Sequence, residues 1–499
     1  MPVLAEYTIR SKQSYIFKTN RITEIAGASA LIRDAFFLLF EVAREEGIKA
    51  EPVSDKSPDF LLKKTLDAFK NGSLQMVELF AGGGNDTVLF DSETTFQRVN
   101  RAYTRKLLDV CPGMIPMCVG ISVGDDGYHY QHDYNRLMLA CEAEKNQMSP
   151  CVSMEPLPFA LRDRAVDQAV VSRETIGAKS EWTAEGLSKL KKYASEPTPV
   201  RALDELATER GVESMLAMVH ADGNNMGQKI IHMLESHPDD YDHCVTLLRK
   251  MTKNVADSFS KCGKQAVEDK AAQLKAAKYA NLPEKAFSVR WIVTEGDDIS
   301  FICNARIAKE LTCAYLEAVA KASPLPEMGQ KYSSCAGICL FHSHFPCSSA
   351  YALAEDACTL AKKHVHETGE DEAWIDFHYL HSGFGSDLTE LRKWQNTLRC
   401  MARPWCVDGE STLFSIANLD TLAQLFKDFK VSRSSIKSLG VAWEIGAEAG
   451  IQELQRVYYR APGLKNKLQD LFENDETALK AIYDLQEVYD VWYGGRDVT

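Results

Sequence analysis

Three aspartates of this chain have the side-chain type and the spacing needed to hold divalent cations. Asp297 and Asp298 are adjacent, and Asp222 follows an earlier apolar run, Met215–Ala221. Hard cations take oxygen ligands, so two Mg²⁺ or Mn²⁺ ions could be held if these carboxylates converge. Such a pair of ions stabilises both the attacking and the leaving oxygens in a displacement at phosphorus. The pattern therefore predicts a two-metal catalytic site at Asp222, Asp297 and Asp298, with the Gly223 carbonyl as a further ligand.

The elements that must bring these carboxylates together can be read from the hydrophobic pattern. Met215–Ala221 is a short apolar run typical of a buried strand, and Arg290–Thr294 and Ile299–Cys303 flank a polar turn as the arms of a hairpin. Ala350–His364 has apolar residues at helical spacing. The order strand, helix, hairpin, strand, helix is that of a ferredoxin-like, or palm, domain.

The same unit occurs twice in the chain. Leu4–Arg10 aligns with Leu216–Asp222 at an offset of 212 residues, and at that offset Asn85 and Asp86 fall on Asp297 and Asp298. Arg10 then stands in the place of Asp222. One carboxylate beside an arginine cannot hold two cations, so we expect the first copy to be catalytically inactive.

The glycine-rich turn of the first copy has two interpretations. Gly82, Gly83 and Gly84 would let backbone N–H groups approach a phosphate or a base closely. They could equally form a tight hairpin without any ligand, and the residues leave both alternatives open.

Composition narrows the class of protein. The formal net charge of −13 over 499 residues does not suit a surface built to grip a nucleic acid backbone. The start of the chain lacks the basic and apolar regions of a signal peptide, and no apolar stretch is long enough to span a bilayer. We therefore expect a cytoplasmic protein with reduced cysteines and no membrane partner.

These patterns predict an α+β fold of two ferredoxin-like palm domains followed by a C-terminal helical domain. The expected segments are a degenerate first palm (1–153), a charged connector (154–212), a catalytic second palm (213–380) and the helical domain (381–499).

The chain resembles the large, polymerase-like subunit of type III CRISPR effector complexes, and more broadly the GGDEF and class III cyclase palms. The motifs that carry the resemblance are Ser14–Phe17, Arg21–Ser29, Gly82–Asn85, Asp222–Gly227, Gly296–Asp298, Asp376–His378 and Ala402–Pro404.

The resemblance implies a nucleotidyltransferase that joins NTPs, ATP in particular, into cyclic di- or oligonucleotide messengers of antiviral defence. CRISPR-type protein partners or RNA are implied with it. The second palm would catalyse and the first would position the partner nucleotide. Nucleotide contacts are expected at Asn224, Asn225, Gly227, Gly296, Lys362, Lys363, Gly82, Gly83, Gly84 and Ser14.

Two departures from the family pattern leave alternatives open. Glu295 replaces the first glycine of the Gly-Gly-Asp-Asp turn, where glycine would allow a positive φ. The chain also begins on the first palm strand at Leu4, without the histidine-aspartate nuclease domain that many members carry. The rival hypotheses are a scaffold subunit of an RNA-guided effector and a nucleotide-sensing pseudo-enzyme.

A cluster of cysteines and histidines in the second palm invites a metal-site interpretation. Cys335 and Cys339 are four residues apart on an expected strand, so their side chains share one face. Free cysteine is commonly buried, which favours core packing over metal binding for this cluster.

Overall fold

The computed structural model describes most of the chain. The described residues are 1–51, 58–82, 84–124, 129–147, 159–164, 166–175, 179, 181–195, 202–209, 212–329, 331–369, 371–380, 387–394, 398–407 and 412–494, with the backbone alone for 58–62, 295, 394 and 398. Within these ranges no helix is both long and apolar enough to cross a membrane.

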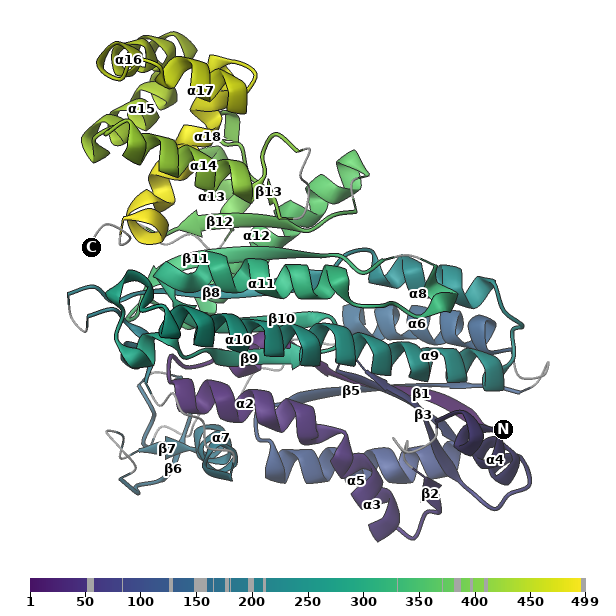
Figure 1. Ribbon diagram of the computed structural model, residues 1–499. Helices are drawn as coiled ribbons and strands as arrows, with labels where there is room; N and C mark the ends of the chain where they lie inside the picture. Colours follow the sequence, from purple (N-terminus) through teal and green to yellow (C-terminus); the bar gives the residue numbers. More distant parts are fainter. Residues whose placement is uncertain are drawn as a thin grey trace. The chain divides into compact units, whose positions relative to one another are not determined.

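The chain divides into two compact units, and Figure 1 labels their helices and strands. Unit 1 comprises residues 1–201, 225–257 and 324–330, and unit 2 comprises 202–224, 258–323 and 331–499. This division differs from the expected segments in two ways. The second palm and the C-terminal helices cluster into one unit, and the stretch 225–257, expected in the second palm, clusters with the first.

Unit 1 is built on a five-stranded sheet of order β2-β3-β4-β1-β5. The central strand, β1, is antiparallel to both β4 and β5. The strands of unit 1 are β1 (Val3–Arg10), β2 (Ala50–Glu51), β3 (Met76–Gly82), β4 (Asn85–Phe90), β5 (Ile115–Ser122), β6 (Val170–Ser172) and β7 (Trp182–Thr183). Its helices are α1 (Lys12–Ile16), α2 (Ile22–Ala35), α3 (Phe37–Glu45), α4 (Pro58–Lys70), α5 (Glu93–Val110), α6 (Tyr130–Gln147), α7 (Ala184–Ser195), α8 (Met226–Glu235), α9 (Tyr241–Val255) and the short η6 (Pro326–Met328).

Unit 2 is built on a six-stranded sheet of order β13-β12-β11-β8-β10-β9. Its strands are β8 (Met215–Gly223), β9 (Arg290–Glu295), β10 (Asp298–Asn304), β11 (Ser334–His342), β12 (Trp374–Tyr379) and β13 (Trp405–Cys406). Strand β8 is central and antiparallel to β10 and β11. The four strands β9-β10-β8-β11 repeat the order β3-β4-β1-β5 of unit 1, so the predicted duplication of a palm is confirmed.

The helices of unit 2 cover this sheet and continue into the C-terminal region. They are α10 (Gly263–Ala276), α11 (Ala308–Lys321), α12 (Cys347–Thr368), α13 (Leu388–Trp394), α14 (Ile416–Asp428), α15 (Arg433–Ile445), α16 (Ala447–Arg460), α17 (Leu464–Leu471) and α18 (Asp475–Val488). Short 3₁₀ segments are η1 (Leu203–Leu206), η3 (Tyr279–Asn281), η4 (Glu284–Phe287), η5 (Ala305–Ile307) and η7 (Leu398–Cys400), and η8 (Tyr489–Tyr493) is π-helical. The predicted α+β class with helical C-terminal region is confirmed.

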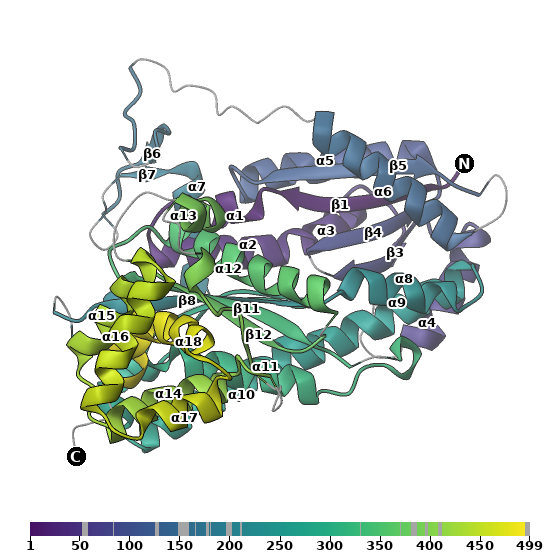
Figure 2. The ribbon, with the colours of Figure 1, turned by 90° about the horizontal axis from the view of Figure 1, so that it is seen from above.

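Helix α12 lies over β8, β11 and β12 (Figure 2). A close approach at Gly337 of β11 makes this packing possible, since a Cβ there would stand 1.9 Å from the carbonyl oxygen of Ala354. Ala354, Ala357 and Ala361 of α12 are fully buried. Small residues on both elements thus seat the helix that carries Lys362 close to the sheet.

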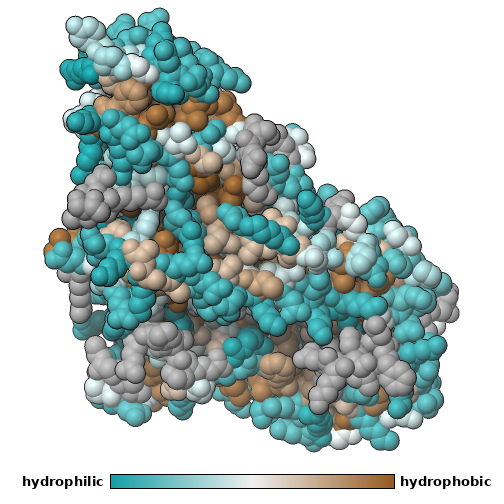
Figure 3. Space-filling model, in the orientation of Figure 1, coloured by the Kyte–Doolittle hydropathy of each residue, from teal (hydrophilic) through white to brown (hydrophobic). Residues whose placement is uncertain are grey.

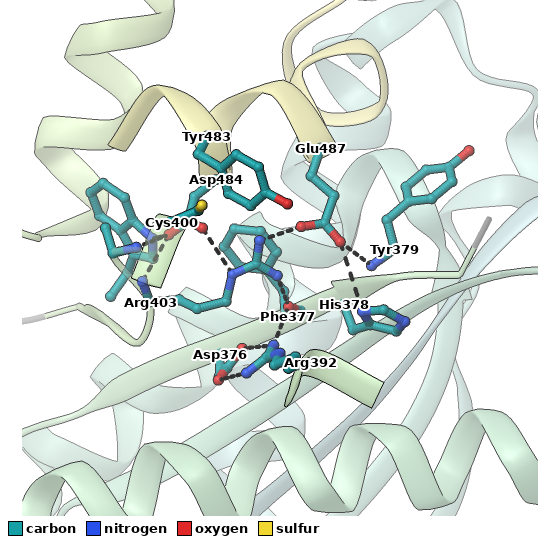
Figure 4. Close-up of polar contacts among 12 residues, drawn as sticks. Asp376, Phe377, His378, Tyr379, Arg392, Cys400, Arg403, Tyr483, Asp484 and Glu487 are labelled. Atoms are coloured by element: carbon teal, nitrogen blue, oxygen red, sulfur yellow. Dashed lines mark hydrogen bonds and ion pairs between the residues drawn. The ribbon is translucent and has the colours of Figure 1, made fainter. Parts of the chain in front are cut away.

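A buried ionic network joins the C-terminal helices to the second palm (Figure 4). Arg403 donates to Asp484 at 3.0 Å, to Glu487, and to the backbone carbonyl of Phe377 on β12. Its guanidinium carbon lies 4.3 Å from the centre of the Phe377 ring. Burial acts against the charge, but Arg403 and then His378 hold the pKa of Glu487 at about 2. Paired, these buried charges stabilise the junction, and removing one of them would leave the others uncompensated.

A second ion pair on β12 completes the junction. Arg392 donates twice to Asp376, with both distances 2.7 Å, and also to the Phe377 carbonyl. Two motifs of the family resemblance, Asp376–His378 and Ala402–Pro404, therefore correspond to one structural device that fixes the helical region to the sheet.

The surface is mostly hydrophilic on the face seen in Figure 3, with hydrophobic patches interspersed among the polar side chains. The hydrophobic side chains of the sheets are inside: Leu216, Val219, Ile299, Phe301 and Ile338 are fully buried. This is the ordinary arrangement of a folded domain in water.

Candidate active site

Two paired strands of unit 2 place the aspartates. Asp222 is the penultimate residue of β8 and pairs with Cys335 of β11 on one side. On its other side β10 runs antiparallel, with Ile299 opposite Ala221. The hairpin turn between β9 and β10 therefore lies beside the end of β8, so the strand register alone brings Asp222, Asp297 and Asp298 together.

The turn accommodates Glu295 without strain in its backbone. Glu295 is the last residue of β9 and pairs with Asp298, so the loop proper is Gly296 and Asp297. The positive φ of 63° falls on Gly296, where glycine is present. Glu295, which stands where the family pattern has a glycine, is therefore at a strand position, and any residue can adopt its backbone conformation.

Asp222, Asp297 and Lys362 form a charged triad. Burial, and after it the negative charge of Asp222, raises the pKa of Asp297 to about 6. The Lys362 ammonium lies 2.6 Å from a carboxylate oxygen of Asp222 and donates to the Gly223 carbonyl at 2.8 Å. Burial opposes the charge of Lys362, but Asp222 and then other neighbours leave its pKa raised. The two neighbouring carboxylates favour a positive charge beside them, and the Lys362 ammonium carries that charge.

Asp298 faces a second group, the imidazole of His220. The distance from Asp298 Oδ1 to His220 Nδ1 is 3.4 Å, and His220 Nδ1 is also 2.9 Å from the hydroxyl of Ser300. Burial lowers the pKa of His220 to about 4. His220 is therefore neutral at pH 7 and does not compete with a cation. Its place two residues before Asp222, on the same face of the strand, is the signal that could have found it in the sequence.

Asn224 is buried and bonded within the protein. It is 2% exposed, and its side-chain amide donates to Ser333 Oγ and to the carbonyl of Glu372, both at 3.1 Å. Its backbone N–H donates to the carbonyl of Ser333 at 2.9 Å. These bonds give Asn224 a structural role, because they fasten the end of β8 to the segments that precede β11 and β12.

Three further contacts were expected in the second copy, at Lys363, Asn225 and Gly227. Lys363 is exposed and stands 3.6 Å from Glu367, so of the two lysines only Lys362 reaches the carboxylates. Asn225 has a left-handed backbone (φ 55°) at the start of α8, the turn-forming role that sequence left open. Gly227 is exposed on α8, where a Cβ would meet open space. Asn225 and Gly227 belong to unit 1.

The expected nucleotide contacts of the first palm are only partly described. Gly82 ends β3, and the carbonyl of Gly84 accepts a hydrogen bond from Lys12 Nζ at 3.0 Å. Ser14 is exposed on the short helix α1. Gly83 lies outside the described residues.

The strand registers correct the alignment of the two palms. In unit 1 Gly82 pairs with Asn85, as Glu295 pairs with Asp298 in unit 2. Asn85 thus corresponds to Asp298, and Asp86 to Ile299, one position away from the alignment at an offset of 212. The residue opposite Asn85 on β1 is Thr8, so Thr8, and not Arg10, corresponds to Asp222.

A matching side-chain pair supports this corrected register. Thr87 donates to Glu6 at 2.6 Å in unit 1, at the positions that Ser300 and His220 occupy in unit 2. The predicted inactivity of the first palm is thereby strengthened, since none of its three corresponding positions, Thr8, Gly84 and Asn85, carries a carboxylate.

The donors of the second palm fit a hard cation. Asp222 and Asp297 offer carboxylates and Gly223 a carbonyl, the oxygen ligands that Mg²⁺ and Mn²⁺ take, and the Lys362 ammonium already lies against two of the three. Asp298 faces His220, and among the described residues no group of three or more His, Cys, Asp or Glu side chains is arranged to hold a metal ion, so the carboxylate donors offered together are two, Asp222 and Asp297. Cys335, Cys339 and Cys347 are fully buried, as expected for core packing.

Comparisons with known proteins match part of the chain to a family. Residues 215–370 match the family described as Cas10/Cmr2, second palm domain. No curated protein matches the chain.

Solved structures of Csm1 share the fold. A Csm1–Csm4 cassette in complex with pppApA has 12% identity and a TM-score of 0.50, covering 98% of this chain and 69% of that one. Csm1 in T.onnurineus has 13% identity and a TM-score of 0.48, covering 97% and 69%. For the cassette with cA4 the values are 12% and 0.46, with coverage of 85% and 62%, so this chain spans less than two thirds of that relative. Residues 215–370 thus match the second palm domain of Cas10/Cmr2, and the chain is similar in fold to Csm1.

Proposed function

We propose that the second palm catalyses nucleotidyl transfer, joining NTPs into a cyclic di- or oligonucleotide with release of pyrophosphate. The observation that carries this proposal is the convergence of Asp222, Asp297 and Lys362 in a segment of Cas10/Cmr2 type. Two carboxylates and one ammonium suit a triphosphate with its cations better than an uncharged substrate. ATP is the proposed substrate, because the cassette similar in fold was solved with pppApA.

The proposed metal ligands are Asp222, Asp297 and Asp298, with the Gly223 carbonyl. Mg²⁺ or Mn²⁺ bound there would supply charge neutralisation at the α-phosphate and lower the pKa of a coordinated hydroxyl. The protein's own part is to hold the carboxylates at the end of β8 and on a two-residue turn, where a neutral His220 adds no competing charge.

Lys362 has a distinct proposed role. In the free protein its ammonium bonds Asp222 and the Gly223 carbonyl. Cations held by these ligands would take the place of the ammonium, and the Lys362 side chain would then be free to contact the triphosphate.

For the first palm we propose a binding role without catalysis. It lacks carboxylates at Thr8, Gly84 and Asn85, and backbone N–H groups of its glycine-rich turn, of which Gly82 and Gly84 are described, would contact the nucleotide.

We further propose that the chain works as the large subunit of a type III CRISPR effector, in the cytoplasm and in antiviral defence. Its relatives were solved as Csm1–Csm4 cassettes, which supports a Csm4-type protein partner. A second candidate function is a scaffold whose main task is assembly with such a partner and RNA. The arginine-centred junction that makes the second palm and the helical region one unit favours this alternative.

Product analysis separates these functions. The purified protein is incubated with each NTP and Mg²⁺ or Mn²⁺, with and without RNA, and the products are identified by mass spectrometry. We expect phosphodiester products from ATP, lost in the double variant Asp297→Ala/Asp298→Ala. A wild-type protein without product under every condition, or a double variant as active as wild type, would contradict the enzymatic proposal. Activity that requires guide and target RNA would place it in an effector complex.

A further inference from the structure

A π-helical segment lies against the catalytic turn. Residues Ala256–Cys262 (η2) form a π-helix between α9 and α10. The hydroxyl of Ser260 in this segment donates a hydrogen bond to the backbone carbonyl of Gly296 at 3.2 Å. Both residues belong to unit 2. π-Helical turns are rare and occur frequently at functional sites.

The bond acts on the peptide that carries Asp297. The carbonyl of Gly296 and the N–H of Asp297 belong to one peptide group, which is planar and moves as a body. Ser260 therefore fixes the plane from which the Asp297 carboxylate is held, at the tip of a hairpin that would otherwise be the most mobile part of the site.

The neighbouring residues of the helix are rigidly packed. Phe259 is fully buried and meets the ring of Tyr332 edge-on, with 5.2 Å between ring centres. Tyr332 directly precedes Ser333 and Ser334, and Ser334 donates to the carbonyl of Asp222 at 3.0 Å. One helical segment thus buttresses residues next to both halves of the aspartate site.

The start of α10 holds the same segment in place. A Cβ at Gly263 would lie 2.4 Å from the ring of Tyr315 on α11, so the helix passes at the closest distance that glycine permits. Trp291 of β9 donates to Glu268 at 3.2 Å, and Lys264 lies 5.1 Å from the centre of the Trp291 ring. The Ser260 hydroxyl, which donates to Gly296, therefore belongs to a helical segment whose continuation, α10, packs against both α11 and β9.

We propose that Ser260 is a positioning residue for the nucleotidyl transfer, orienting the Gly296–Asp297 peptide so that the Asp297 carboxylate is held toward its cation. This inference rests on the proposed function. A hydroxyl at residue 260 is required, and the side chain itself touches neither cation nor nucleotide.

The test compares three variants with wild type. Ser260→Ala removes the donor, Ser260→Thr keeps a hydroxyl, and Ser258→Ala removes a buried hydroxyl from the same π-helical segment without affecting the bond to Gly296. The measurements are kcat and KM for ATP with Mn²⁺, the Kd for Mn²⁺ alone by calorimetry, and the Tm.

For Ser260→Ala we expect kcat to fall about five- to tenfold, as for the loss of one hydrogen bond, with KM for ATP and Tm close to wild type. Its Kd for Mn²⁺ should rise severalfold. Ser260→Thr should restore both values to within about twofold, and Ser258→Ala should match wild type.

Three results would overturn the inference. A Ser260→Ala protein with wild-type kcat and Mn²⁺ affinity refutes it while the proposed function stands. Failure of Ser260→Thr to restore either value assigns Ser260 a packing role. A wild-type protein that neither binds Mn²⁺ nor forms product refutes the proposed function and the inference together.

Discussion

The two palms are built alike, and the same strand positions serve opposite purposes in them. In the second palm the end of β8 and the tip of the β9–β10 hairpin carry Asp222, Asp297 and Asp298. In the first, the corresponding positions carry uncharged residues, and its nearby carboxylate, Asp86, is fully buried at the position of Ile299. One position along a strand reverses the face of a side chain. A shift of one residue therefore separates an accessible carboxylate from a buried one.

The largest expected effect is that of removing a proposed metal ligand from the second palm. Asp222→Asn should lower product formation by about a thousandfold or more, because a metal ligand is lost where charge develops on phosphate. Thr8→Val, at the corresponding position of the first palm, should leave product formation within about twofold of wild type. Initial rates of pyrophosphate release measure both. Equal losses in the two variants would refute the division of roles.

Glu6 and Thr87 form a buried pair in the first palm at the positions of His220 and Ser300 in the second. The ionisation of Glu6 should make the folding stability depend on pH. Burial, opposed by Thr87, raises the pKa of Glu6 from 4.5 to about 7. Below pH 4.5 both the folded and unfolded states are protonated. Between pH 4.5 and 7 the unfolded state loses the proton first, so folding stability falls with rising pH, by about 3 kcal/mol in all.

The matched variant is Glu6→Gln, which keeps an acceptor for Thr87 and cannot ionise. Relative to wild type, its Tm should gain from about pH 5 to pH 7 and level off above that. Thermal unfolding of both proteins across this range measures the difference. A constant difference in Tm would show that Glu6 does not titrate in this window.

Asp86 is a buried carboxyl group of the first palm at the position where the second palm has Ile299. Both of its carboxylate oxygens are buried without a hydrogen-bond partner, and burial raises its pKa well above the ordinary value. Asp86→Val should therefore stabilise the protein by about 1–3 kcal/mol, seen as a higher Tm. The reverse change in the second palm, Ile299→Asp, should lower the Tm. A destabilised Asp86→Val would mean that the carboxyl group has a role the sheet packing does not reveal.

The smallest expected effect concerns two lysines, Lys145 on α6 and Lys362 on α12. Lys362 competes for Asp222 and the Gly223 carbonyl, so Lys362→Met should lower the Kd for Mn²⁺ about fivefold in the absence of nucleotide. Lys145→Met, at the corresponding exposed position, should leave that Kd unchanged. Calorimetric titration with Mn²⁺ measures both. Weaker Mn²⁺ binding in Lys362→Met would contradict the exchange of lysine and cation.

Sequence reasoning recovered the duplication because each palm repeats a run of apolar residues and turn signals in the same order. It predicted Asp222, Asp297 and Asp298 as site residues, since charged residues at strand ends are visible as departures from an apolar pattern, whereas Lys362 and Lys363 were expected from the family resemblance. It misaligned the two hairpins by one residue, because in the letters alone Asn85-Asp86 matches Asp297-Asp298 better than the true register does.

Other features had no signal in the sequence. Asn224 looked like a ligand contact because an asparagine after Asp-Gly is typical of a polar turn, and only its buried bonds to Ser333 and Glu372 show a structural role. Ser260 is one serine in a long helical stretch, and a π-helical segment has no distinctive spacing of apolar residues.

The amino-acid sequence by itself determined that this protein has two palms, that only one carries the aspartates, and that a lysine follows on the last helix of each. Tertiary structure decided which of these groups meet. Strand register set Asp222 beside the turn, placed the positive φ on Gly296 instead of Glu295, and brought Ser260 to the Gly296 carbonyl. The physical reason is that side-chain types and their periodicity are local properties of the chain. Register and helix packing depend on contacts between residues far apart in it.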